Sequence, residues 1–201
     1  MEHVSKRFGD FYANRDINLS VRKGEVHTLL GENGAGKSTL LGAIAGSLPL
    51  SAGQIVLDGQ DMTRMKEHRR SHAIGRLFQD PLKGTARTMT IEENLGLAYS
   101  RGKRRSLQLG VSRKDEQFFY DLLKSLNLGL EDRMKTPAGH LSGGQRQALT
   151  LLMATVVTPK LLLLDEHTAA LDPRTAQAIM ELTQRIIERD QITTLMITHN
   201  I

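Results

Sequence analysis

The sequence predicts an α/β fold in which a parallel β-sheet core is interrupted by an inserted helical segment. Three observations predict it. Apolar segments of strand length alternate with helical patterns near both ends of the chain, a glycine-rich loop joins one strand to a helix, and residues of roughly 80 to 158 show helical periodicity instead. With 201 residues, 39% of them hydrophobic, the chain has the size of one domain with a smaller inserted lobe.

The N-terminal part is predicted to contain short strands and one helix. The helix should run from Lys37 to about Ala45, directly after the glycine-rich loop. A turn is expected at Asp58-Gly59, and Pro81 keeps Asp80 out of the helical region, so a loop should begin there. Extended segments are predicted at Ile17–Val21, Val26–Leu30, Gln54–Leu57 and Ala73–Phe78.

The middle of the chain has the features of helices. Thr90 with Glu93, and Ser112 with Asp115, have the spacing of capping boxes. Apolar residues then recur at helical spacing, at Phe118, Phe119, Leu122, Leu123 and Leu126. Beyond residue 158 the α/β pattern resumes with a buried strand Leu161–Leu164, a helix Pro173–Arg189 and a strand Thr193–Ile197.

The composition limits the cellular compartment and the kinds of site that we expect for this chain. The chain has no cysteine, which excludes disulfides and thiolate metal sites and agrees with a reducing compartment. No apolar run approaches the roughly 18 residues of a membrane-spanning helix, and the first ten residues lack a signal-peptide pattern, so we expect a cytosolic location. The net charge is +5, and part of the excess lies in one run, formed by Arg101, Lys103, Arg104, Arg105, Arg113 and Lys114. Nucleic acid or anionic lipid could bind such a run, but without interleaved aromatics we interpret it as a solvated loop.

The glycine-rich loop carries the strongest chemical signal. Gly31-Glu32-Asn33-Gly34-Ala35-Gly36-Lys37-Ser38-Thr39 satisfies G-x-x-x-x-G-K-[ST] between a predicted strand and a predicted helix. Its backbone N–H groups and the positive end of the helix would bind phosphate oxygens. Lys37 would reach the β and γ phosphates, and the Ser38 hydroxyl would bind Mg²⁺.

Two carboxylates end the buried strand of four leucines. Asp165 and Glu166 should lie at the carboxyl edge of the sheet, where ligands of open α/β sheets bind. Asp165 would bind Mg²⁺, and Glu166 would polarise the water that attacks the γ-phosphate. Two solvated acids at a strand end are the alternative, which the phosphate loop makes less attractive.

A second phosphate-binding feature follows in the helical segment. In Leu141-Ser142-Gly143-Gly144-Gln145, Ser142 is a good N-cap, and the helix that Gln145 opens could bind a phosphate at its N-terminus. One nucleotide does not need two such sites on one chain. We therefore expect Ser142, Gly143, Gly144 and Gln145 to contact the nucleotide of an opposing subunit, although an ordinary helix entry remains the alternative.

Together, the phosphate loop and Leu-Ser-Gly-Gly-Gln resemble the signature pair of the ABC ATPase family. Further motifs follow in the family's order over essentially the whole chain. Gln79 resembles the Q-loop glutamine that senses Mg²⁺ and lies where the permease docks, Leu171-Asp172 the D-loop, and His199 the switch histidine at the γ-phosphate. Phe8 resembles the aromatic residue that stacks on adenine, with Tyr12 as the other candidate and core packing as the alternative for Phe8.

The resemblance implies a P-loop NTPase (RecA-like) fold, with a parallel-sheet core, an antiparallel N-terminal β lobe and an inserted helical subdomain. The whole chain would be a single ABC ATPase domain. Residues 1–79 and 159–201 would form the nucleotide-binding core, and 80–158 the helical signature subdomain. Nucleotide contacts would come from Phe8, Gly31, Asn33, Gly34, Ala35, Gly36, Lys37, Ser38, Thr39, Ser142, Gly143, Gly144, Gln145 and Asp172. Mg²⁺ would be held by Ser38, Gln79 and Asp165, and catalysis would depend on Glu166, His199, Lys37 and Gln79.

The sequence departs from the family pattern in places. His167 stands where proline usually follows the catalytic glutamate, and Ala169 replaces a common serine. His167 could be a pH-sensitive neighbour of Glu166, but we interpret it as a neutral loop residue. The sequence also stops at Ile201, just past the switch histidine, where relatives continue, so we expect it to be truncated at the C-terminus.

The resemblance predicts an ATPase subunit that dimerises on ATP and drives solute transport. A second ATPase subunit, normally an identical one, would complete the dimer. The dimer would bind transmembrane permease subunits at the cytoplasmic face of the membrane. The system could also include a solute-binding protein. The spacing and identity of the residues from Gly75 to Asn94 resemble those of import-type subunits and, more loosely, those of amino-acid uptake systems. The alternative function is a soluble ABC ATPase acting on nucleic acid or the ribosome, supported only by the basic run; we expect no nucleic-acid partner.

Overall fold

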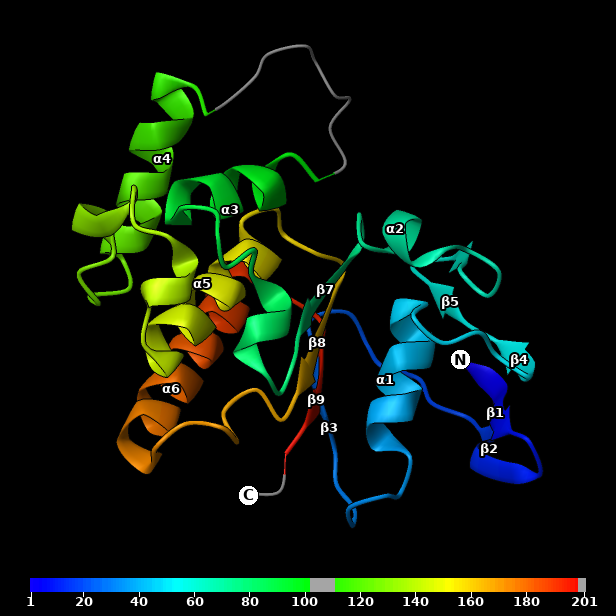
Figure 1. Cartoon of the computed structure of the whole chain (residues 1–201). Coiled ribbons are helices and arrows are strands. Elements are labelled where there is room, and N and C mark those ends of the chain that lie inside the picture. Colours follow the sequence, from blue (N-terminus) through cyan, green and yellow to red (C-terminus); the bar gives the residue numbers. More distant parts are fainter. Residues whose placement is uncertain (102–110, 199–201) are drawn as a thin grey trace. The chain divides into compact units, whose positions relative to one another are not determined.

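The computed structural model describes residues 1–101 and 111–198. They form two compact units. The first unit comprises Met1–Arg76, Pro159–Glu166 and Gln191–Ile201, and the second comprises Leu77–Thr158 and His167–Asp190. The helical part was expected at 80–158, and the second unit also includes the long helix that follows residue 172 (Figure 1).

A four-stranded sheet forms the centre of the first unit. Its order is β3-β9-β8-β7, with β3 at Val26–Leu29, β9 at Thr194–Ile197, β8 at Leu161–Asp165 and β7 at Ile74–Leu77. Strands β3 and β8 both pair with β9 in parallel. All residues of β8 are buried, as its run of leucines predicts for a strand covered on both faces. The predicted strands at these four places are confirmed, with each end within one residue of its prediction.

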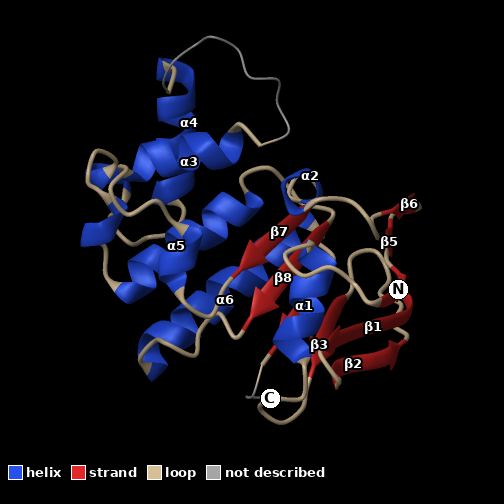
Figure 2. Ribbon diagram, turned by 45° about the vertical axis from the view of Figure 1, so that its right-hand side comes forward, coloured by secondary structure: helices blue, strands red, loops and turns tan. Residues whose placement is uncertain are grey.

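Helix α1, Lys37–Ala45, packs against this sheet (Figure 2). Leu41 of α1 and Leu163 of β8 are fully buried in one apolar cluster with Val4. Burying a large aliphatic side chain stabilises a fold by about 1.5–3 kcal/mol, so this cluster fixes the helix against the strands. The predicted bounds of the helix are confirmed.

An antiparallel sheet and a short hairpin complete the first unit. The sheet has the order β2-β1-β4, with β1 at Glu2–Phe8, β2 at Phe11–Ile17 and β4 at Ala52–Gln54. Strands β5, Val56–Leu57, and β6, Gln60–Asp61, form the hairpin around the predicted turn at Asp58-Gly59. Both turn residues have positive φ, which a tight hairpin turn requires.

The strand expected at Ile17–Val21 was wrong. Strand β2 begins at Phe11 and ends at Ile17, and no strand covers residues 18–25. The alternation of apolar and polar residues there is real, because Ile17 and Leu19 pack partly buried against the apolar cluster. Leu19 instead exchanges hydrogen bonds with Met1, so the segment is held outside the sheet.

Helices make up the second unit. The α-helices are α3 Ile91–Tyr99, α4 Arg113–Lys124, α5 Gly143–Thr155 and α6 Pro173–Asp190, and short 3₁₀ turns are η1 Pro81–Gly84, η2 Glu131–Arg133 and η3 Ala138–His140. The capping boxes predicted at Thr90 and Ser112 are both present and begin α3 and α4. Phe119 and Leu149 are fully buried among the helices.

A buried arginine holds the end of α1. Arg70 is the last residue of α2, Glu67–Arg70, and is only 3% exposed. Its guanidinium donates to backbone carbonyls of the first unit, those of Ala43, Ile44, Thr63 and Met65. Burial lowers the pKa of Arg70, but an arginine guanidinium is not deprotonated in proteins, so the side chain keeps its charge. A cation at the C-terminus of a helix is favourable, so Arg70 stabilises α1 by charge as well as by hydrogen bonding.

Replacing Arg70 by methionine should destabilise the protein by about 2–4 kcal/mol, because several buried carbonyls would lose their donors while the packing volume is kept. Urea unfolding followed by circular dichroism measures this as a lower midpoint. The exposed neighbour Arg69 provides the matched control. Arg69→Met should shift the free energy of unfolding by less than about 0.5 kcal/mol, and equal effects of the two variants would contradict this role of Arg70.

Candidate active site

The glycine-rich loop lies where the sequence predicts, between β3 and α1. Gly36 is the N-cap of α1 and has φ +85°, which is the left-handed region. A Cβ atom there would lie 2.1 Å from the carbonyl oxygen of Ala13. Glycine is therefore required both by the backbone conformation and by the close approach of β2.

Lys37 lies across this loop. Its ammonium donates to the carbonyl oxygens of Gly31, at 2.6 Å, and Glu32, at 2.9 Å. The charge is thus held beside the backbone that the motif assigns to phosphates. Phosphate oxygens are strong acceptors for such a cation, so this arrangement suits an anionic ligand.

The structure brings Ser38 and Asp165 together across 127 residues of sequence. The Ser38 hydroxyl donates to Asp165 Oδ1 at 2.9 Å, next to the phosphate loop. The two groups offer the hard oxygen ligands that Mg²⁺ prefers when it also binds phosphates. The residues present therefore fit Mg²⁺ at this place.

Arg76 was missed by the sequence analysis. Its Nη2 lies 3.9 Å from Asp165 Oδ2, and burial lowers the pKa of Arg76 without removing its charge at neutral pH. Arg76 is on β7, the neighbour of β8 in the sheet. The charged residue within an otherwise apolar predicted strand, Ala73–Phe78, was the signal that could have found it.

Glu166 has an unusual backbone. It follows β8 directly and has φ +46°, which costs free energy for any residue with a Cβ atom. Its backbone N–H donates to the carbonyl of Ile197 at the end of β9, at 3.2 Å. The sheet thus holds this residue in the strained conformation beside Asp165. Strained backbone of this kind is common at catalytic positions.

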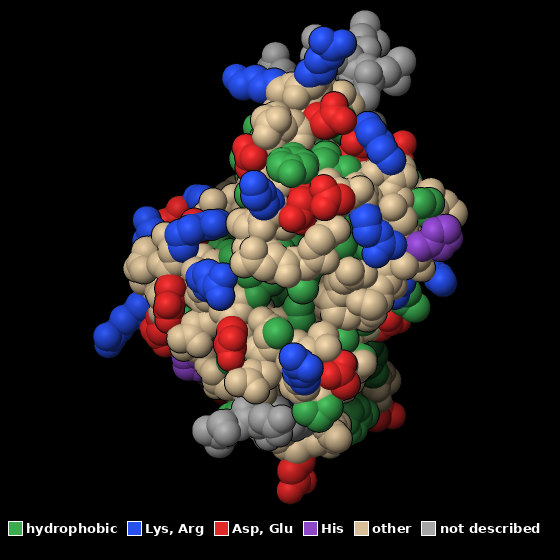
Figure 3. Space-filling view, turned by 90° about the vertical axis from the view of Figure 1, so that its left-hand side faces the viewer, with side chains coloured by type: hydrophobic (Ala, Val, Ile, Leu, Met, Phe, Trp, Pro, Cys, Tyr) green, Lys and Arg blue, Asp and Glu red, His purple; other side chains and the backbone are tan. Residues whose placement is uncertain are grey.

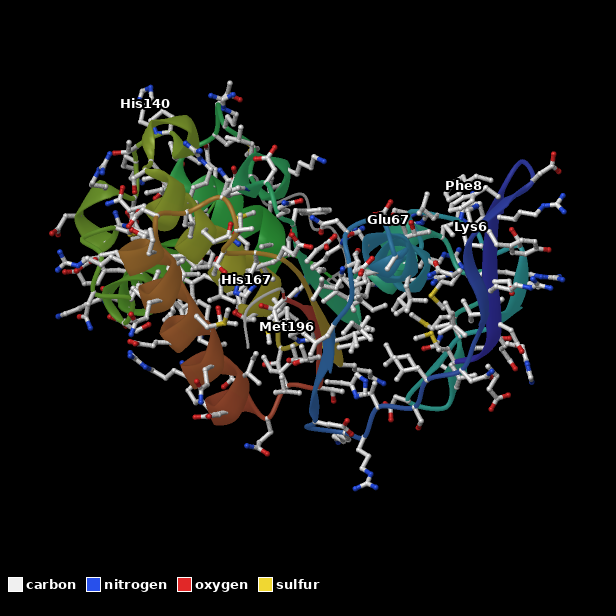
Figure 4. The ribbon with its side chains drawn as sticks, turned by 90° about the horizontal axis from the view of Figure 1, so that it is seen from below. Lys6, Phe8, Glu67, His140, His167 and Met196 are labelled. Atoms are coloured by element: carbon white, nitrogen blue, oxygen red, sulfur yellow. The ribbon has the colours of Figure 1, made fainter. Side chains whose placement is uncertain are left out.

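Phe8 and Tyr12 differ in their surroundings. Phe8 is 48% exposed, which excludes simple core packing, and the Lys6 ammonium lies 4.8 Å from its ring centre (Figure 4). Tyr12 already has two guanidinium groups near its ring, those of Arg7 and Arg15. This arrangement favours Phe8 as the more accessible platform for a base.

The Ser142 loop belongs to the second unit and has the predicted cap. Ser142 begins α5 through a capping box with Gln145. The glycines have a packing reason as well, because a Cβ on Gly144 would lie 2.3 Å from Thr175 Cγ2. Asp172 accepts from the N–H of Thr175 at 3.1 Å and so caps α6. Hydrogen bonding to the side chain of Thr175, and then to its N–H, lowers the pKa of Asp172. The loop and Asp172 are therefore adjacent within this unit.

Gln79 lies in a segment of the second unit that precedes a short 3₁₀ turn. Gln79 is exposed, between β7 and η1, and Asp80 caps η1 through the N–H of Leu82. The prediction that Asp80 lies outside the helical region is confirmed, but a 3₁₀ turn follows it instead of the expected loop. His199 lies outside the described residues.

His167 is buried and neutral. Its Nε2 lies 3.2 Å from Thr183 Oγ1, and the Thr183 hydroxyl donates its proton to the carbonyl of Ile179. Nε2 must therefore carry the proton and donate to Thr183. Burial lowers the pKa of His167 to about 4, so the ring does not titrate near pH 6 to 7.

His167 should make the protein less stable in mild acid. The unfolded chain protonates this histidine near pH 6.5, while the folded chain resists until about pH 4, so stability is lost as pH falls between these values. The loss is on the order of 3 kcal/mol. His167→Gln should remove most of this slope in urea unfolding measured from pH 7.5 to 4.5. The exposed His140 supplies the control, since His140→Gln should keep the slope; a slope equal to wild type in His167→Gln would refute the buried neutral state.

The fold and the phosphate loop with its nearby carboxylates define a P-loop nucleoside triphosphatase. The sequence matches the family model described as ABC transporter over residues 14–169. The chain belongs to this family and is an ATP-binding, ATP-hydrolysing domain of the ABC class, as the resemblance predicts.

Relatives in sequence support the same assignment. The chain is 41% identical to a tyrosine transport ATP-binding protein of Clostridioides difficile, over 100% of this chain and 82% of the relative. It is 38% identical to a sulfate/thiosulfate import ATP-binding protein of Chromobacterium violaceum, over 100% of this chain and 54% of that protein. A methionine import ATP-binding protein of Chromohalobacter salexigens is 35% identical, with 99% and 56% covered. The chain thus spans about half the length of the latter two relatives.

Solved structures agree with the predicted fold class. The chain resembles the ADP conformation of an ATP-binding cassette of an ABC transporter, with a TM-score of 0.81, 30% identity and coverage of 100% of this chain and 80% of that one. It also resembles a dimeric ATP-binding cassette in a post-hydrolysis state bound to ADP and Pi, with a TM-score of 0.80, 28% identity and coverage of 99% and 87%. The α/β fold with a parallel sheet and antiparallel strands is confirmed.

Proposed function

We propose that this chain powers the import of amino-acid-like solutes by hydrolysing ATP in a dimer attached to permease subunits. The observation that carries the ATPase part is the Ser38–Asp165 contact beside the phosphate loop. The transport part rests on the relatives, which are named for tyrosine transport, sulfate/thiosulfate import and methionine import. Of these three relatives, the one named for tyrosine has the largest covered share, which favours an amino acid.

The proposed chemistry assigns a role to each residue near the loop. Backbone N–H groups of Gly31, Asn33, Gly34, Ala35 and Gly36, with the N-terminus of α1, would bind the phosphates, and Lys37 would neutralise them. Ser38 and Asp165, joined by Gln79 as the resemblance implies, would hold Mg²⁺, and Thr39 would contact phosphate. The ion supplies charge neutralisation at the phosphates. Glu166 would accept a proton from the attacking water, and His199 would contact the γ-phosphate.

A dimer would complete the site. The N-terminus of α5, with Ser142, Gly143, Gly144 and Gln145, offers a second set of donors for phosphate. We assign it to the nucleotide of an opposing, identical subunit, with Asp172 close by. The dimeric solved relative with ADP and Pi supports this arrangement. ATP would join the two subunits, and hydrolysis would release them.

The permease partners follow from the transport proposal. The exposed Gln79 segment is the proposed docking place for them. None of the helices in residues 1–101 and 111–198 has the length and apolar character needed to cross a bilayer. The relatives named for transport and import support a place at the cytoplasmic face, bound to separate permease subunits, in a system that could include a solute-binding protein.

Little supports the alternative function on nucleic acid. Lys103, Arg104 and Arg105 of the basic run lie outside the described residues. Arg101 is not a free surface cation, because its guanidinium donates to the carbonyls of Ala154 and Val157. On the face drawn in Figure 3, lysine and arginine side chains are interspersed with acidic ones. The observations favour transport.

Glu166→Gln should form dimers with Mg-ATP while hydrolysing it at least about 100-fold more slowly, because a general base is lost but binding is kept. Light scattering and phosphate release measure the two effects. Adding Ser142→Arg should abolish the dimers, since the bulky cation would occupy the N-terminus of α5.

Ser112 provides a matched control for this experiment. It is also a capping-box serine of the second unit, at the start of α4. Ser112→Arg in the Glu166→Gln background should leave dimers intact. Dimers that survive Ser142→Arg would contradict the composite site, and loss in both variants would indicate damage to helix caps in general.

The solute can be tested in cells. Deleting the gene for this chain should reduce uptake of labelled tyrosine to background, because the permease would lose its ATPase. The wild-type gene should restore uptake, the Glu166→Gln gene should not, and sulfate uptake should stay unchanged. Loss of sulfate uptake alone would contradict the amino-acid assignment, and increased retention of tyrosine would contradict import.

A further inference from the structure

We propose that Asn14 is a positioning residue, which fixes the Phe8 platform relative to the phosphate loop. Base and phosphates would then be bound as parts of one rigid site. The inference rests on the proposed nucleotide site and on Phe8 as its base platform. Asn14 is on β2, outside both the phosphate loop and the strand ends that carry the other proposed site residues.

The contact itself joins β2 to the last glycine of the loop. Asn14 is 7% exposed, and its Nδ2 donates to the carbonyl oxygen of Gly36 at 3.1 Å. The backbone beside it presses on the same glycine, because a Cβ on Gly36 would meet Ala13 O at 2.1 Å and Asn14 Nδ2 at 2.8 Å. Lys37 follows directly, so the contact attaches the hairpin to the rigid glycine loop that carries the phosphate-binding residues.

An irregularity in the hairpin directs Asn14 to this place. Arg7 is paired with Tyr12, but the preceding Lys6 is paired with Asn14, so Ala13 is an extra residue in β2. Such a bulge reverses the side of the sheet on which the following side chains lie. Tyr12 therefore lies with Arg7, whereas Asn14 lies beside Lys6.

Lys6 connects Asn14 to Phe8. The Lys6 side chain is largely buried, and its ammonium donates to Pro49 O at 2.8 Å while lying 4.8 Å from the Phe8 ring centre (Figure 4). The exposed ring is thus joined to Gly36 in three steps: Lys6 lies against the Phe8 ring, Lys6 is paired with Asn14 across the two strands, and Asn14 donates to Gly36 O. This connection gives the hairpin a defined distance from the phosphate loop.

Stability alone does not account for an amide at position 14. Asn14 Oδ1 is buried and has no hydrogen-bond partner within the described part of the chain. A half-satisfied buried amide is costly, and an apolar group of the same shape is often neutral or stabilising in its place. The amide of Asn14 is therefore better explained by its hydrogen bond to Gly36, which positions the loop, than by a contribution to the stability of the fold.

The test compares ADP with pyrophosphate, since pyrophosphate uses the phosphate loop without the base platform. Asn14→Leu should raise the Kd for Mg-ADP about fivefold to tenfold, the value of one hydrogen bond, and change that for Mg-pyrophosphate less than twofold. Titration calorimetry measures both. The melting temperature of the free protein should not fall.

Asn18 provides the matched control on the same hairpin. Its amide is bound only to hairpin backbone, donating to Asp16 O and accepting from the N–H of His3. Asn18→Leu should leave both dissociation constants unchanged. Equal weakening of ADP and pyrophosphate by Asn14→Leu, or no weakening of either, would overturn the proposal.

A double-mutant cycle covers the case of a poorly folded variant. Asn14→Asp keeps the shape but places a carboxylate against Gly36 O, and it should weaken ADP binding in wild type but not further in Phe8→Ala. Additive effects would overturn the coupling. Lys37→Ala distinguishes failure of the proposed nucleotide site from failure of this inference. If Lys37→Ala leaves ADP binding intact, the proposed nucleotide site is wrong. If Lys37→Ala weakens ADP binding but the Asn14 variants do not, only the role of Asn14 is wrong.

Discussion

The buried strand β8 is the constraint on which the first unit depends. Every residue from Leu161 to Asp165 is buried, so neither its position nor its register can change without exposing leucines to water or breaking the pairing with β9. Register then decides where the strand ends, and hence where Asp165 meets Ser38. An apolar run with no chemistry of its own thus sets the geometry of two polar groups that are far apart in sequence.

The two helices whose N-termini face phosphates in the proposed mechanism, α1 and α5, are both stabilised at their C-termini by an arginine from another element. Neither α1 nor α5 has a basic residue in its last turn, although a cation there is favourable. An arginine from elsewhere in the same unit takes this place in both: Arg70 donates to Ala43 O and Ile44 O, and Arg101 to Ala154 O and Val157 O. The N-terminus of each helix is left for a ligand while its C-terminus is fixed by the fold.

What the sequence predicted well was local. The phosphate loop, the caps at Thr90, Ser112 and Ser142, and the buried strand of leucines each depend on residues close together in sequence, and all lie where predicted. The start of β2 could not be found, because the alternation after Ile17 reflects packing against the core and not pairing in a sheet. Arg70, Arg76 and Asn14 were missed because their partners are brought to them only by folding.

Glu166 shows how such long-range order can serve catalysis. Its left-handed backbone costs on the order of 1–3 kcal/mol, and such strain persists only where the surroundings fix the chain on both sides. Here the preceding residue ends a fully buried strand, the following residue His167 is itself buried, and the N–H of Glu166 is bound to Ile197 O. In this chain the next residue is not the proline that the family usually has but a buried histidine, whose ring is held by its partner Thr183. The backbone at Glu166 is therefore fixed by the interior, although the residue after it differs from the family pattern.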